Sequence, residues 1–78
     1  MAKPTRQRRA GRKTLRARGF TPSVLDKGSD RTMWTLPNDP TIWVIETAEV
    51  FLYMDKGRSG RGKTLDEAER NAKRTRGF

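Results

Sequence analysis

The residues with the clearest chemical potential are the glycines and basic side chains between Gly57 and Thr64. An apolar run over residues 50–54 precedes this segment and a helical pattern follows it, so the sequence predicts a strand, a loop and a helix in that order. Glycines allow successive backbone N–H groups to converge on an anion, and the positive end of a following helix adds to the attraction. We therefore expect the basic side chains of this loop to contact phosphate: Arg58, Arg61 and Lys63.

The loop also resembles the phosphate-binding motif of P-loop NTPases, G-x-x-x-x-G-K-S/T, in its strand–loop–helix context. Those enzymes need a parallel sheet, an acidic strand end that holds Mg²⁺ and a residue that positions water. Only residues 65–78 follow the motif, which is too few for these parts, so we expect no nucleotide hydrolysis. Two interpretations stay open: contact with nucleic-acid phosphates, or a flexible basic turn in which the glycines only permit the chain to reverse.

The charge of the chain is concentrated at one end. The sequence contains 18 Lys+Arg against 9 Asp+Glu, a formal net charge of +9, so a polyanion is the first partner to consider. Residues 1–19 contain no acid, and two glycines there each weaken a helix by about 1 kcal/mol relative to alanine. We therefore predict a disordered basic arm over residues 1–19 and a folded domain over residues 20–78. The candidate nucleic-acid-binding residues of the arm are Arg6, Arg8, Arg9, Arg12, Lys13, Arg16 and Arg18.

Part of this arm, residues 5–13, is similar to the arginine-rich motifs of phage antitermination proteins and to the basic tails of ribosomal proteins. The resemblance implies binding to RNA or DNA by counterion release, in which each neutralised phosphate adds roughly 0.7–0.9 to the salt dependence of the affinity. The alternative is a solubilising tail that meets polyanions without specificity.

The residue types exclude most catalysis. The chain has no cysteine and no histidine, which removes disulfides, thiolate zinc sites and the Ser–His and Cys–His nucleophile pairs. We therefore predict that the protein is not an enzyme and holds no metal or cofactor. No apolar run approaches the roughly 20 residues that cross a bilayer. Because the N-terminal residues also lack the apolar segment of a secretory signal, we expect a cytoplasmic location and no membrane partner.

Three segments have the composition of strands: residues 31–36, which alternate, residues 41–47, which are apolar on both faces, and residues 50–54. Residues 37–40, Pro-Asn-Asp-Pro, form a turn between the first two. We predict an α+β fold in which one C-terminal helix packs on a three-stranded antiparallel sheet (β-β-β-α) and the basic N-terminal arm is mobile.

The C-terminal helix has the clearest local signals. Thr64 and Glu67 have the spacing of a capping box. Leu65, Ala68 and Ala72 form a narrow stripe of mostly small residues, which predicts a close approach to the sheet.

A second face of the same helix is basic. It either contacts phosphates or is solvated, with Asp66–Arg70 and Glu69–Lys73 pairs that neutralise one another. Its candidate phosphate-contacting residues are Arg70, Lys73 and Arg74.

The large rings give two further possibilities. Proteins that bind single strands stack bases on rings displayed by a sheet, but a core this small needs the same rings, so we expect Trp34 and Trp43 in the core. The sheet face that the helix leaves uncovered must be buried by residues 20–25, by self-association or by a protein partner. The alternative function is therefore a small adaptor or inhibitor, of the phage-encoded kind, that binds another protein through that face.

The order of a basic segment, three strands and a helix preceded by Gly60-x-Gly62-Lys63 is similar to the double-stranded-RNA-binding domain and to the arm-binding domains of phage integrases. The sequence departs from the first family because acidic residues follow Thr64 where that family has lysines. It departs from the second because the strand region has only two basic side chains, Arg31 and Lys56. We expect a small basic nucleic-acid-binding protein, without assignment to either family.

Overall fold

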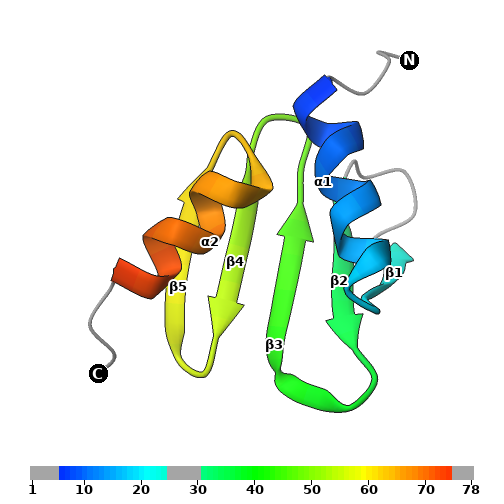
Figure 1. Ribbon diagram of the computed structural model, residues 1–78, viewed down its shortest axis with the longest axis vertical. Helices are drawn as coiled ribbons and strands as arrows, with labels where there is room; N and C mark the ends of the chain where they lie inside the picture. The colour runs from blue at the N-terminus through cyan, green and yellow to red at the C-terminus, as the bar shows by residue number, and fades with distance from the viewer. Residues whose placement is uncertain (1–5, 25–30, 75–78) are drawn as a thin grey trace.

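The architecture is α+β and begins with a helix. The computed structural model describes residues 6–24 and 31–74, except for the side chains of Arg6, Gln7 and Val24. The elements in order are α1 (Arg6–Ala17), β1 (Thr21–Val24), β2 (Thr32–Leu36), β3 (Asp39–Glu46), β4 (Phe51–Asp55), β5 (Arg58–Gly62) and α2 (Leu65–Arg74) (Figure 1). The strands form one antiparallel sheet whose order follows the sequence, β1-β2-β3-β4-β5.

The sheet has five strands, so the prediction of three is wrong. The three expected strands are present as β2, β3 and β4, and an additional strand pairs on each side of them. β1 contains Pro22 and β5 contains Gly60 and Gly62, and neither strand has the apolar alternation that sequence reasoning depends on. Such strands are stable at sheet edges, where only one side of the backbone needs hydrogen-bonding partners and only one face packs.

The segment expected to be a phosphate-binding loop is a hairpin turn followed by strand β5. Lys56 and Gly57 have φ angles of 51° and 89°, which is the left-handed pair that a two-residue type I′ hairpin requires. Gly60 and Gly62 have extended backbone and pair with Tyr53 and Phe51. Residues 58–62 are therefore held straight by the ladder to β4, and the expected concave loop is absent from this segment.

The N-terminal segment expected to be mobile contains helix α1, so that prediction is wrong for residues 6–17. Helical spacing places Arg8, Gly11, Arg12 and Leu15 on one side of α1. Leu15 is fully buried, and a Cβ added to Gly11 would lie only 2.4 Å from Cζ of Phe51. The glycine that was expected to weaken this helix is thus the residue that lets it approach the sheet.

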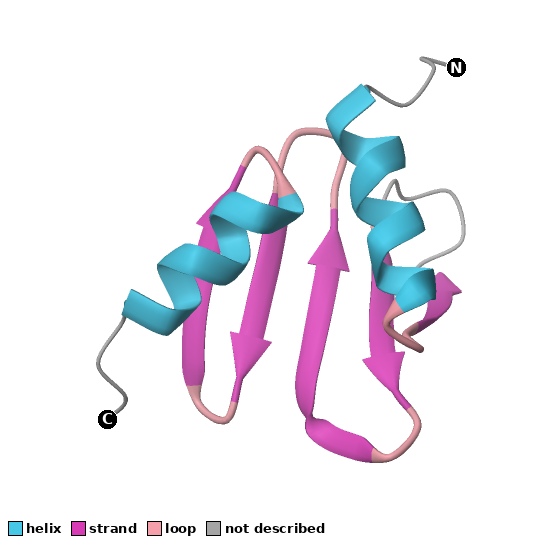
Figure 2. Ribbon diagram, viewed as in Figure 1, coloured by secondary structure: helices cyan, strands magenta, loops and turns pink. Residues whose placement is uncertain are grey.

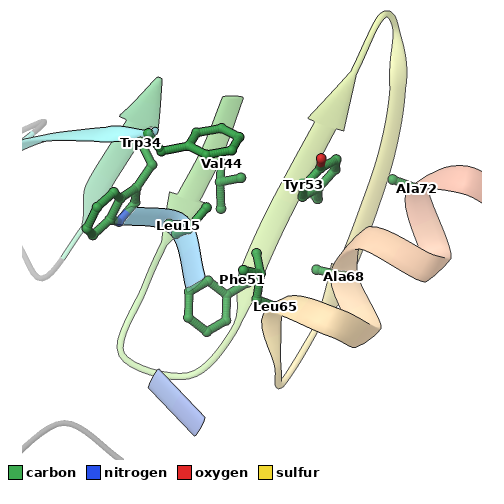
Figure 3. Close-up of a cluster of buried hydrophobic side chains, with 9 residues drawn as sticks. Leu15, Trp34, Val44, Phe51, Tyr53, Leu65, Ala68 and Ala72 are labelled. Carbon is green, nitrogen blue, oxygen red and sulfur yellow. The ribbon is translucent and has the colours of Figure 1, made fainter. Parts of the chain in front are cut away.

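Both helices lie on the same face of the sheet (Figures 1 and 2). The register places Trp34, Val44, Tyr53 and Gly60 side by side on that face, and the buried cluster forms between it and the helices. Its members are Leu15, Phe20, Trp34, Val44, Phe51, Tyr53, Leu65, Ala68 and Ala72 (Figure 3). Within the described residues, no helix is long and apolar enough to span a membrane.

Candidate nucleic-acid interface

The carboxylate of Glu46 anchors α1 to the sheet. Glu46 is fully buried at the end of β3, and both Arg8 and Arg12 bind its Oε2 atom, with Nε of Arg12 at 2.6 Å. Trp34 donates from Nε1 to Oε1 of Glu46 at 2.9 Å. A buried carboxylate requires such partners, because an uncompensated charge in the interior costs several kcal/mol. Two of the arginines predicted to bind nucleic acid therefore have a structural partner, and Arg8 is only 7% exposed.

Docking of the inner side of α1 leaves a row of cations on its outer side. Arg9, Lys13 and Arg16 follow one another at i, i+4 and i+7, and all three are exposed. We call these three residues the α1 basic row. The guanidinium of Arg16 lies over the ring of Trp34, 5.6 Å from its centroid, which restricts the orientation of this side chain. Helix α1 contains no acidic residue, so nothing within it neutralises the row.

Arg18 links the two helices. Its Nη1 atom lies 3.0 Å from Oε1 of Glu69 in α2, and Nζ of Lys73 lies 3.3 Å from the other oxygen of the same carboxylate. Asp66 and Arg70 form a second, longer pair at 4.0 Å. Both of the pairs expected within α2 are therefore present, and Arg70 and Lys73 each have a carboxylate beside them.

Two ionisable groups at this helix junction have altered pKa values. Burial would raise the pKa of Glu69, but the hydrogen bond and charge of Arg18, together with those of Lys73, outweigh burial and place the pKa below its usual value. Burial raises the pKa of the Tyr53 phenol, and the negative charges of Glu69 and Asp55 raise it further. At neutral pH the junction therefore holds an ionised Glu69 next to a neutral Tyr53.

The glycines of the predicted phosphate loop instead permit helix packing. A Cβ added to Gly60 would lie 2.1 Å from the backbone nitrogen of Ala72 and 2.4 Å from the carbonyl oxygen of Ala68. A Cβ on Gly62 would lie 2.7 Å from the backbone nitrogen of Ala68. This confirms the close approach predicted from the small-residue stripe of α2. It also gives Gly62, one of the two glycines of the P-loop-like pattern, a role that involves no nucleotide.

The N-terminus of α2 is capped by the chain itself. The backbone N–H of Glu67 donates to Oγ1 of Thr64 at 3.1 Å, as the capping box predicts. The carboxylate of Glu67 turns back and accepts from the N–H of Lys63 at 3.4 Å, one residue earlier than in the standard box. Protein side chains thus accept from two of the backbone N–H groups that could otherwise bind an anion at this helix end.

The remaining candidate residues are dispersed. Arg58 and Arg61 are exposed but point to opposite faces of β5, because they are three positions apart on a strand whose side chains alternate. Lys63 and Arg74 are also exposed, and the side chain of Arg6 lies outside the described residues. In the part of the chain that the structure describes, no three acidic side chains form a group that could hold a metal ion.

No protein-family model, curated protein or solved structure matches this chain. The resemblances to arginine-rich arms, to the double-stranded-RNA-binding domain and to integrase arm-binding domains therefore depend on sequence patterns alone. The element order also has two more strands than the α-β-β-β-α pattern of the double-stranded-RNA-binding domain.

Proposed function

We propose that the protein binds the phosphate backbone of a nucleic acid through the α1 basic row, Arg9, Lys13 and Arg16. The observation that supports this function is the division of cations in α1, in which the inner arginines bind Glu46 and the outer cations face solvent without an acid in the helix. Lys and Arg side chains bind phosphate by releasing condensed counterions, so such a row favours polyanions over single small anions.

The dimensions of the row suit consecutive phosphates. From Arg9 to Arg16 the helix rises about 10 Å at about 1.5 Å per residue. One strand of a duplex has a phosphate about every 3.4 Å along the duplex axis, so a row that lies parallel to this axis spans roughly three phosphate steps. Because α1 is already docked, binding does not require the ordering of a flexible arm, and less conformational entropy is lost. Contacts of this kind fix position without reading bases, so the proposal includes both RNA and DNA.

The test is fluorescence anisotropy of labelled duplex DNA, duplex RNA and single-stranded RNA at several salt concentrations. We expect the variant with Arg9→Gln, Lys13→Gln and Arg16→Gln to reduce the slope of log affinity against log salt by roughly 2 to 3, at roughly 0.7–0.9 per contact. The matched control changes Arg70, Lys73 and Arg74 to Gln, which removes the same formal charge from α2.

The control should change the slope by less than the roughly 0.7–0.9 that one phosphate contact contributes. Thermal unfolding should show that both variants fold. If the slope fell equally in the two triple variants, the nucleic acid would be attracted only by the net charge of the protein, and a site on α1 would be refuted. An unchanged slope in the α1 variant would refute it as well.

A further inference from the structure

The sheet face opposite both helices is apolar, and no described element covers it. The register aligns Met33, Ile45 and Leu52 in one row and Trp43 and Met54 in the next, all of them half-buried. The other side chains that alternate onto this surface carry hydroxyl groups, with one exception, Arg61. We call this surface the open face; its residues are Thr21, Ser23, Met33, Thr35, Trp43, Ile45, Leu52, Met54, Ser59 and Arg61.

The open face contains a hollow of about 390 Å³ over β3, β4 and β5. Four apolar side chains line it, and Ser59 and Arg61 border it on the side of the edge strand; the apolar lining residues are Trp43, Ile45, Leu52 and Met54. This volume lies within the range of roughly 300–1,000 Å³ that is typical of ligand pockets. A single large apolar side chain of a partner therefore fits into the hollow, as anchor residues do in protein interfaces.

The charges around the hollow select the kind of partner. Arg61 is exposed, and none of the open-face residues is acidic, so a carboxylate next to the apolar anchor would complement this surface. A second copy of the chain offers no open-face carboxylate to Arg61 and carries a formal charge of +9 against +9. Stacked bases need aromatic rings, whereas Trp43 provides the only ring on the open face and the other apolar side chains are aliphatic or thioether groups.

We propose that the open face docks an acidic segment of another protein, whose large apolar side chain enters the hollow and whose neighbouring Asp or Glu pairs with Arg61. Met33 and Met54 make the surface adaptable, since thioether side chains repack easily around different anchors. This site lies on the opposite side of the sheet from the α1 basic row, so a nucleic acid and the acidic segment can bind together.

The probe is a phage-displayed library of random linear peptides, selected on the full-length immobilised protein. We expect the enriched peptides to contain a large apolar residue next to Asp or Glu, and to change the indole N–H signal of Trp43 when they are titrated in ¹H–¹⁵N NMR spectra. Arg61→Glu should weaken these peptides at least tenfold, and replacement of the peptide carboxylate by Lys should restore binding to that variant. Arg58→Glu, on the same strand but the other face, is the matched control and should leave binding unchanged.

Three outcomes would overturn the proposal. The first is a failure of the peptide test, in which either the selected peptides contain no Asp or Glu or the peptides bind Arg61→Glu as tightly as the native protein. The second is a concentration-dependent dimer in size-exclusion chromatography with light scattering that Ile45→Asp abolishes, because a second copy would then be the occupant. The third is a single-stranded oligouridine that moves the Trp43 signal, which would assign the open face to nucleic acid. The open face and the α1 basic row share no residue, so this test can fail while the proposed function holds, and the reverse.

Discussion

Gly60 in β5 and Ala72 in α2 meet through their backbones, because a Cβ added to Gly60 would lie 2.1 Å from the nitrogen of Ala72. Helix and strand therefore approach one another more closely than any pair of larger residues would allow. Ala68 and Ala72 supply the matching small surface on the helix and are both fully buried. The approach of α2 to the sheet thus depends on small residues from both elements.

We expect Gly60→Ala to lower the free energy of unfolding by about 1–3 kcal/mol or more, because the added methyl group meets backbone atoms that cannot rotate away. Urea denaturation followed by circular dichroism measures the change. Arg58→Ala on the same strand is the control and should stay within about 0.5 kcal/mol of the native protein. Equal stabilities of the two variants would show that the strand and the helix are farther apart than the structure indicates.

We expect Glu46→Gln to destabilise the protein by about 3–5 kcal/mol, because it removes the carboxylate that Arg8 and Arg12 share while Arg8 stays buried. Hydrogen exchange should show the loss of protection first in the amides of α1. Glu49→Gln, in the exposed loop after β3, removes the same charge and should have little effect. Retained protection of α1 in Glu46→Gln would mean that the apolar contacts of Leu15 suffice to dock the helix.

The bridge between Arg18 and Glu69 should contribute stability only above acidic pH. The pKa of Glu69 in the folded protein lies below its ordinary value of 4.5, so the contribution is complete above pH 4.5 and is lost as pH falls through the lower folded pKa. We expect the native protein to exceed Glu69→Gln in stability at neutral pH and the difference to vanish at low pH. A difference that persists in strong acid would contradict an ionic origin.

Tyr53 provides an optical test of the same junction, since it is the only tyrosine in the sequence. Burial and the nearby carboxylates raise its pKa above the ordinary 10.0, so the phenol should stay neutral to higher pH in the folded chain than in urea. The stability that this neutral phenol provides is complete below pH 10.0 and declines as pH rises above it. The ultraviolet absorbance of the phenolate follows both titrations, and coincident midpoints would contradict the burial of Tyr53.

The sequence predicted the elements whose signals are local. The apolar runs identified β2, β3 and β4, and the Thr64–Glu67 spacing identified the start of α2. Helix α1 was missed because its inner side is formed mainly by Arg8 and Arg12, whose partner Glu46 lies 38 and 34 residues away. One signal was available in the sequence. Glu46 lies two positions after Val44, so in a strand its carboxylate is on the same face as the Val44 side chain, and a carboxylate on the core face requires cationic partners.

The two tryptophans show why strand pairing limits such predictions. Both were expected in the core; Trp34 is 1% exposed, as predicted, whereas the prediction for Trp43 is wrong because its side chain lies half-buried on the open face. The two rings lie on opposite faces of the sheet because Trp34 pairs with Val44 and Trp43 pairs with Thr35 in this register. An irregularity between Thr35 and Leu36 shifts that register, and the turn sequence alone does not specify it.

The sequential strand order has a consequence for how the chain reaches this structure. Each strand pairs with its neighbour along the chain, so the sheet can grow hairpin by hairpin, and hairpins form within about 1–10 μs. Helix α1 must wait, because its arginines find their carboxylate only after β3 has joined the sheet. During synthesis α1 is the first of the described elements to leave the ribosome, yet we expect it to take its place only after β3 has paired.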